Sequence, residues 1–186
     1  MSIEMNKSLQ EQVENIYNLV AEANEKMFYV WKENILFTWQ WWLSVALTIL
    51  PWIFWIKFRK KDSTIRLLSA GLFVILISSW LDFFGISLGL WYYIYDVIYI
   101  IPNYFPWDFT LLPVTIMFLI QFKPNSNRYI KAIFFSLLAS FVAEPFFIWI
   151  GMYQPKKWEH IYSFPIYIVI FLIADYISKR SSWEKI

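Results

Sequence analysis

The sequence predicts an all-α integral membrane protein. We expect a bundle of five transmembrane helices that contains two parallel helical-hairpin repeats and follows an N-terminal amphipathic helix. The 186 residues are 59% hydrophobic and 23% aromatic, which is more large apolar side chain than a soluble domain of this size can bury. Five apolar stretches are each long enough to cross a hydrocarbon core of about 30 Å, which takes about 20 helical residues. Basic residues gather at one set of their ends.

Residues 1–36 form the first predicted unit, an extracytoplasmic amphipathic helix. Apolar residues recur there at alternating spacings of four and three, and no proline or glycine interrupts them. Glutamates outnumber lysines on the polar face, which argues against an anchor on anionic lipids. Two arrangements stay open: the helix lies on the protein's own outer face or at the membrane interface, or it forms a coiled coil with a second copy or a partner. The apolar seam consists of Leu9, Val13, Ile16, Val20, Ala23, Met27 and Val30.

Residues 37–180 form the predicted transmembrane bundle. Pro106 and Pro165 open the third and fifth spans, because proline is favoured in the first helical turn, and Asp108 complements the positive end of the helix dipole. Residues 85–105 are apolar enough for a sixth crossing, but that crossing would put the later basic loop outside. Their many Tyr and Trp suit the headgroup layer, so we expect a re-entrant or interfacial segment. The five spans are placed at 38–57, 65–84, 106–122, 131–151 and 162–178.

The distribution of positive charge predicts the orientation. Basic residues follow the first span, the third span and the fifth span, and short basic loops stay in the cytoplasm. We therefore expect the N-terminus outside and residues 181–186 as a cytoplasmic tail. The basic residues are Lys57, Arg59, Lys60, Lys61, Arg66, Lys123, Arg128, Lys131, Lys179, Arg180 and Lys185.

An internal repeat relates residues 61–93 to residues 123–155 at a constant shift of 62. Nine of the 33 aligned positions are identical, among them Arg66/Arg128 and Gly89/Gly151. This shift predicts repeat units at 61–122 and 123–180. Internal repeats build many membrane proteins, in which the functional residues lie at the interface between the repeats.

Acidic residues within the spans are the candidates for chemistry, because ionisable groups are costly in a membrane. The shift of 62 brings Asp82 onto Glu144 and Trp91 onto Tyr153. Each acid could accept structural hydrogen bonds from a neighbouring helix. Alternatively, the two could converge to bind a cation or proton, or act as acid and base. Pro145 loosens the helix directly after Glu144.

The ligand-binding candidates extend to an outer vestibule. Asp96 and Asp108 are expected to face the same side as the two intramembrane acids. Asp175 instead precedes Lys179 by one helical turn, which predicts a surface ion pair. The six candidates are Asp82, Trp91, Asp96, Asp108, Glu144 and Tyr153.

The composition also excludes several classes of function. There is no cysteine and one histidine, His160, so we expect no metal site. Phosphate-binding loops and hydrolase motifs are missing, and with four glycines we expect no nucleotide cofactor. Basic residues beyond those that set orientation are few, which argues against a nucleic-acid partner.

Residues 37–178 contain Pro51-Trp52, Asp82, Gly89-Leu90-Trp91-Tyr92, Pro106-Trp107 and Ala143-Glu144-Pro145. With these motifs the region resembles a family of small, functionally uncharacterised multipass membrane proteins of endospore-forming bacteria. The resemblance implies a multi-pass protein of the bacterial cytoplasmic (inner) membrane. A looser similarity is to the repeat of heterodimeric-type carotenoid (lycopene) cyclases, with an intramembrane acid, a Gly-x-Trp-x-Tyr stretch and a helix led by proline. That repeat has paired acids after the proline, whereas Asp108 stands alone here.

Three functions agree with these features. The one we favour from the sequence is a non-catalytic membrane partner or scaffold, which would associate through Leu9, Val13, Ile16, Val20 and Met27. The second is a binder or carrier of a lipid-like or small cationic ligand at the outer vestibule. The third is a lipid- or isoprenoid-modifying enzyme that uses Asp82 and Glu144.

Overall fold

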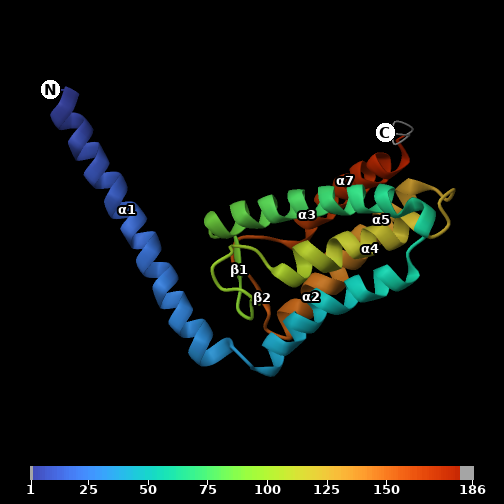
Figure 1. Cartoon of the computed structure of the whole chain (residues 1–186), viewed down its shortest axis with the longest axis horizontal. Helices are drawn as coiled ribbons and strands as arrows, with labels where there is room; N and C mark the ends of the chain where they lie inside the picture. Colours follow the sequence, from blue (N-terminus) through green and yellow to red (C-terminus); the bar gives the residue numbers. More distant parts are fainter. Residues whose placement is uncertain (1, 181–186) are drawn as a thin grey trace.

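The computed structural model describes residues 2–180 and has an all-α architecture with one short β-ribbon (Figure 1). The predicted tail, 181–186, lies outside the described residues. The helices are α1 (Ser2–Val30), α2 (Trp39–Phe58), α3 (Thr64–Ser87), α4 (Leu112–Gln121), α5 (Arg128–Leu138), α6 (Glu144–Trp149) and α7 (His160–Lys179). A 3-10 turn, η2 (Lys61–Ser63), precedes α3, and π-helical turns form η1 (Trp31–Ile35), η3 (Trp107–Leu111) and η4 (Ala139–Ala143). The strands are β1 (Trp91–Tyr93) and β2 (Tyr153–Pro155).

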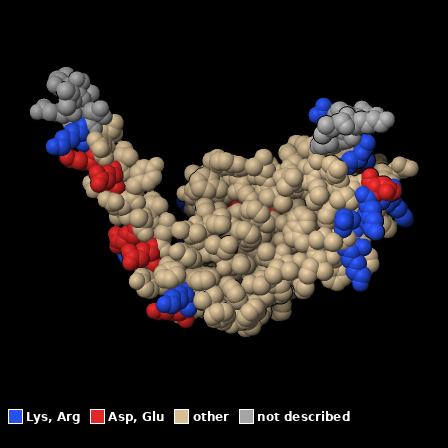
Figure 2. Space-filling model, in the orientation of Figure 1, with Lys and Arg blue, Asp and Glu red and all other residues tan. Residues whose placement is uncertain are grey.

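Four helical segments of the described chain are long and apolar enough to cross a membrane. They are Trp39–Phe58, Lys61–Ser87, Arg128–Trp149 and His160–Lys179. Their surfaces carry many exposed large apolar side chains, such as Ile53, Leu72 and Phe134. Figure 2 shows charge gathered on α1 and at the end of the bundle near the C-terminus, with an uncharged face between them. This distribution supports the predicted membrane protein, because lipid tails accept an apolar surface that water does not.

The third predicted span is shorter than a membrane crossing. Helix α4 continues the five-residue turn η3 with ten residues, so the two together rise only about 22 Å at 1.5 Å per residue. Helix α4 is packed inside the bundle, where Ile116 and Met117 are fully buried against α3, α5 and α7. A helix enclosed by protein can begin below the membrane surface, because it does not face lipid.

Residues 88–104 contain strand β1 and turns and no helix, so this segment does not form a sixth helical crossing. Strand β1 pairs antiparallel with β2, and Tyr92 lies opposite Gln154. Each strand follows a helix that ends at a glycine with positive φ, +66° at Gly89 and +77° at Gly151. The amides after these glycines close the same turn, Leu90 N to Gly85 O and Met152 N to Phe147 O, both at 2.9 Å. Glycine suits this position because it adopts the left-handed conformation without a steric cost.

Helix α1 projects away from the bundle (Figure 1). Its last turn and η1 hold it: Phe28 and Trp31 pack on Tyr99, and Trp31 Nε1 donates to the carbonyl of Asp96 at 2.9 Å. The apolar seam is exposed, with 43% of Val13 and 62% of Ile16 accessible. The seam therefore does not cover the protein's own bundle.

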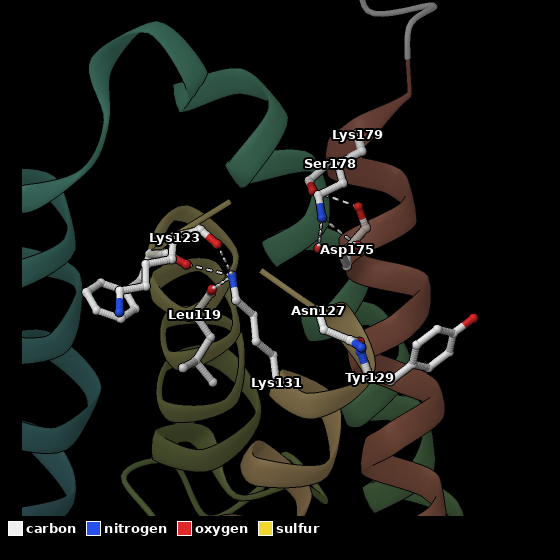
Figure 3. A network of polar contacts seen from close by, with 9 residues as sticks. Leu119, Lys123, Asn127, Tyr129, Lys131, Asp175, Ser178 and Lys179 are labelled. Carbon is white, nitrogen blue, oxygen red and sulfur yellow. Dashed lines mark hydrogen bonds and ion pairs between the residues drawn. The ribbon is translucent and has the colours of Figure 1, made fainter. Parts of the chain in front are cut away.

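A buried ammonium group closes the end of α4 (Figure 3). Lys131 Nζ donates to the carbonyls of Leu119, Phe122 and Lys123 at 2.7, 2.6 and 3.1 Å. Carbonyls at a helix C-terminus lack partners within the helix, and a cation there also complements the helix dipole. Helix α7 carries the predicted pair of Lys179 with Asp175 at 2.8 Å, but the carboxyl is buried, not on the surface as the sequence suggested.

Lys131→Met should destabilise the fold, because it leaves three carbonyls without their donor. We expect the free energy of unfolding in neutral detergent micelles to fall by about 2–4 kcal/mol. Arg128→Met, an exposed cation on the same helix, is the matched control and should cost less than about 0.5 kcal/mol. Equal losses in the two variants would contradict the capping role of Lys131.

Candidate functional site

A cleft lies where the strands meet the ends of α3, η3, α6 and α7. It contains about 700 Å³ of space, including its open mouth. Three carboxyl groups line it, those of Asp82, Asp108 and Glu144, and the rest of its wall is mainly aromatic. Figure 2 shows a little acidic surface recessed in the uncharged face of the bundle. The aromatic wall is formed by Trp91, Tyr93, Tyr104, Trp107, Phe147, Tyr153, Trp158 and Tyr167.

Asp82 is held by three donors from the segment that follows its own helix. Its Oδ1 accepts from Trp91 Nε1 at 2.9 Å and from the Tyr93 hydroxyl at 3.0 Å. Its Oδ2 accepts from the backbone amide of Tyr104 at 3.1 Å. Since a buried carboxylate is costly without such donors, these bonds fix strand β1 and the loop before η3 against α3.

Asp108 lines the same cleft as Asp82, and the two carboxyl groups are close enough to interact electrostatically. The Oδ2 atom of Asp108 is buried and has no hydrogen-bond partner within the described chain.

Glu144 belongs to a second network in the same cleft. Its Oε2 lies 2.8 Å from His160 Nδ1, and its Oε1 accepts from the Tyr167 hydroxyl at 3.0 Å. The indole of Trp107 donates to Tyr167 in turn, at 3.2 Å. His160 is the more exposed partner, with 31% of its side chain accessible against 8% for Glu144. The pair therefore leads from the buried acid toward the protein surface.

Two π-helical turns set the positions of these acids. Turn η3 holds Asp108 and precedes Pro113 by two residues, while η4 ends beside Glu144 and precedes Pro145 by two residues. Proline has no amide hydrogen and its ring clashes with the preceding turn, so the helix widens there. The widened turns bring both carboxyl groups into the cleft.

The structure brings together five of the six predicted site residues. Trp91 and Tyr153 line the cleft with the three acids, but Asp96 does not. Its carbonyl accepts from Trp31 instead, which ties the loop to η1. Burial raises the pKa of the Asp96 carboxyl well above its usual range, and the nearby Asp82 raises it further. The predicted role of Asp96 in the cleft is therefore not supported.

Two alternatives were left open for the aligned acids: structural hydrogen bonds from neighbouring segments, or convergence on a shared site. Both acids accept structural hydrogen bonds, Asp82 from Trp91 and Tyr93 and Glu144 from Tyr167. Both also line the same cleft, but no hydrogen bond of the described chain links one to the other.

Among the cleft residues that were not singled out from the sequence are Tyr93, Tyr104 and Tyr167. Burial raises the pKa of the Tyr93 phenol well above its usual range, and the charges of Asp82 and Asp108 add to this shift. Burial also raises the phenol pKa of Tyr104 and of Tyr153. These phenols stay protonated and act as donors. The sequence offered one sign that Tyr93 belongs to the site with Trp91: the two are alternate residues of one strand, and alternate residues of a strand face the same side.

The described residues contain no group of three His, Asp or Glu side chains arranged to hold a metal ion. No protein-family model, curated protein or solved structure matches this chain. The resemblance to the endospore-former family therefore stays a prediction.

Gly85→Ala should damage the site from outside it. A Cβ atom at this position would lie 2.0 Å from Cζ2 of Trp91, so the indole must move and its N–H must leave Asp82. We expect the free energy of unfolding in micelles to fall by about 2–4 kcal/mol.

Gly71→Ala is the matched control in the same helix. Its Cβ would meet Sδ of Met117 at 2.8 Å, and a methionine side chain adjusts more easily than a ring fixed by a hydrogen bond. The result that contradicts the prediction is a loss at Gly85 no larger than the loss at Gly71.

Proposed function

We propose that this membrane protein binds a lipid-like molecule that carries a positively charged group, with that group at the Asp82–Asp108 pair. One observation carries the proposal: Asp108 Oδ2 is buried and has no partner among residues 2–180, although it lines an open cleft. A buried polar atom without a partner is costly, and a bound ammonium group would supply the missing hydrogen bond.

The wall of the cleft supports a mainly apolar ligand. Leu81, Leu112, Ile166 and Ile170 lie among its aromatic residues. Aromatic faces attract cations through their quadrupoles, by about 0.5–2 kcal/mol, and ligand sites commonly combine an apolar wall with a few polar groups. The same surroundings would repel an anionic headgroup, because no lysine or arginine of the described chain lines this cleft.

Binding explains the site better than catalysis does. A lipid- or isoprenoid-modifying enzyme would use Asp82 and Glu144 as acid and base. Three donors hold Asp82, and His160 and Tyr167 hold Glu144. The free carboxyl oxygen belongs to Asp108, which suits a contact to a ligand group.

The proposal includes the five-span topology, with the N-terminus outside and the C-terminus in the cytoplasm. The end of the bundle away from the strands carries Lys57, Lys60 and Arg128, which supports a cytoplasmic location of that end. The strands and the cleft are then at the outer end. The short helix α4, which runs inside the protein below the cleft, would be the third of these five spans.

The proposal also includes the duplicated hairpin. The glycine turns at Gly89 and Gly151 are 62 residues apart and share their hydrogen-bond pattern. Trp91 pairs with Pro155, and Tyr93 pairs with Tyr153. If each residue is exchanged for its equivalent 62 positions away, each of these pairs becomes the other. Such pairing is expected of two copies related by a two-fold axis through Tyr92 and Gln154.

Dodecylammonium should bind to the purified protein in neutral maltoside micelles and change its tryptophan fluorescence in a saturable way. Dodecanoate, with the same chain and the opposite charge, should bind much more weakly. Asp108→Asn should weaken binding of the ammonium by on the order of tenfold or more, because a hydrogen bond to a charged group contributes about 1.5–3 kcal/mol.

Asp62→Asn is the control, since this acid lies in the exposed turn η2 and its loss changes the net charge equally. It should leave the affinity unchanged. Equal affinity of the Asp108→Asn variant, or equally tight binding of dodecanoate, would refute the proposed site.

A second candidate function is association through α1, the scaffold role that the sequence favoured. The exposed seam supports it, because apolar residues along one face of an isolated helix commonly mark a contact surface. Leu9, Val13, Ile16, Val20 and Met27 are all between 43% and 62% accessible.

Val13→Cys and Val20→Cys each introduce a single cysteine into a chain that has none. If α1 pairs with a second copy, oxidation in membranes should join two chains at both sites. Asn18→Cys, on the opposite face of the helix, is the control and should crosslink far less. Absence of crosslinking at both seam positions would contradict self-association.

A further inference from the structure

A second pocket lies at the other end of the bundle, between the start of α3, the end of α4 and the end of α7. Three cationic side chains line it, those of Lys60, Arg66 and Lys179. Two hydroxyl groups and an amide join them, from Ser63, Ser178 and Gln121. The pocket contains about 620 Å³, including its mouth. It is separate from the acid-lined cleft and shares no residue with it.

Hydrogen bonds from two loops fix the shape of this pocket. The Gln121 side chain accepts from the backbone amide of Lys60 at 3.1 Å and donates to the carbonyl of Phe58 at 3.2 Å. Arg66 Nη1 donates to the carbonyl of Arg180 at 3.4 Å, which joins α3 to the end of α7. The walls are therefore positioned before any ligand arrives.

The charges in this pocket are only partly balanced. Lys179 pairs with Asp175 (Figure 3), and that carboxyl is buried. Within the described chain, no carboxylate lies within ion-pair distance of Lys60 or Arg66. Lys131 adds positive charge nearby. The pocket therefore presents at least two unpaired cations together with neutral donors.

The floor of the pocket is apolar. Leu67 and Ile120 line it and are almost fully buried, and the exposed apolar residue Ile65 lies on α3 beside Arg66. A guanidinium group, an ammonium group and hydroxyl donors above an apolar surface match a phosphate group that is attached to acyl chains. Basic pockets between transmembrane helices bind anionic headgroups in this way.

We infer that this pocket binds a phosphate-bearing anion through Lys60, Arg66 and Ser63. The phosphate can belong to the headgroup of an anionic phospholipid or be free inorganic phosphate. The inference does not depend on the ligand of the acid-lined cleft.

The test uses the whole protein in neutral maltoside micelles, titrated with dioleoylphosphatidylglycerol, dioleoylphosphatidylcholine or inorganic phosphate. Bound lipid is counted by native mass spectrometry, and the shift in unfolding temperature is measured for all three. We expect the glycerol lipid to bind at one saturable site, and the choline lipid to bind at least tenfold more weakly. Lys60→Gln with Arg66→Gln should weaken that site on the order of tenfold or more.

The matched control is Lys57→Gln with Arg128→Gln. It removes one lysine and one arginine from the same end of the bundle, and neither residue lines the pocket. It should retain the affinity of the unmodified protein. Lys60→Gln alone changes an exposed side chain, so it keeps the test valid if the double variant does not fold.

The outcomes separate the two sources. Stabilisation by phosphatidylglycerol alone identifies a lipid headgroup site, and stabilisation by inorganic phosphate identifies a site for the free anion. Equal loss of binding in the pocket variant and the control variant would overturn the inference, because the affinity would then follow net charge alone. Failure of both ligands to bind would overturn it too.

Discussion

The fold of the strand-bearing end depends on one constraint, the burial of the Asp82 carboxyl group in an apolar bundle. A charged or polar group in such surroundings must find donors. Asp82 finds them in Trp91, Tyr93 and the amide of Tyr104. These residues lie on the chain between α3 and η3, so the bonds fold that segment back over the helix end. The cleft exists because this segment is held there without a helix of its own.

The same constraint explains why the second and third acids differ from the first. Glu144 is satisfied by His160 and Tyr167, whereas Asp108 keeps one oxygen without a partner within residues 2–180. Widened helical turns before Pro113 and Pro145 place both groups. One cleft thus contains two acids with hydrogen-bond partners on both carboxyl oxygens and a third, Asp108, whose Oδ2 has no partner among the described residues. The pocket at the opposite end is lined by Lys60, Arg66 and Lys179, so the two ends of the bundle differ in the sign of their charged side chains.

Sequence reasoning was most successful where a single physical rule dominates. Apolar length located the helices to within a few residues, and the turns at Gly89 and Gly151 agree with the repeat. It was less successful where distant segments meet. The spacing of Asp82 and Asp108 in the sequence does not indicate that they come close together. Their proximity depends on how residues 88–104 fold back over the end of α3. The burial of Asp175 and the exclusion of Asp96 from the cleft likewise depend on neighbours far away in the sequence.

The central claim is that Asp82 binds the returning segment to α3, and a double-mutant cycle between Asp82 and Tyr93 tests it most directly. Asp82→Leu, Tyr93→Phe and the double variant would be compared by equilibrium unfolding in one detergent. The account predicts a coupling free energy of about 1.5–3 kcal/mol, the usual range for a hydrogen bond to a charged group. Additive effects, with a coupling below about 0.3 kcal/mol, would contradict it, because the two side chains would then stabilise the protein independently.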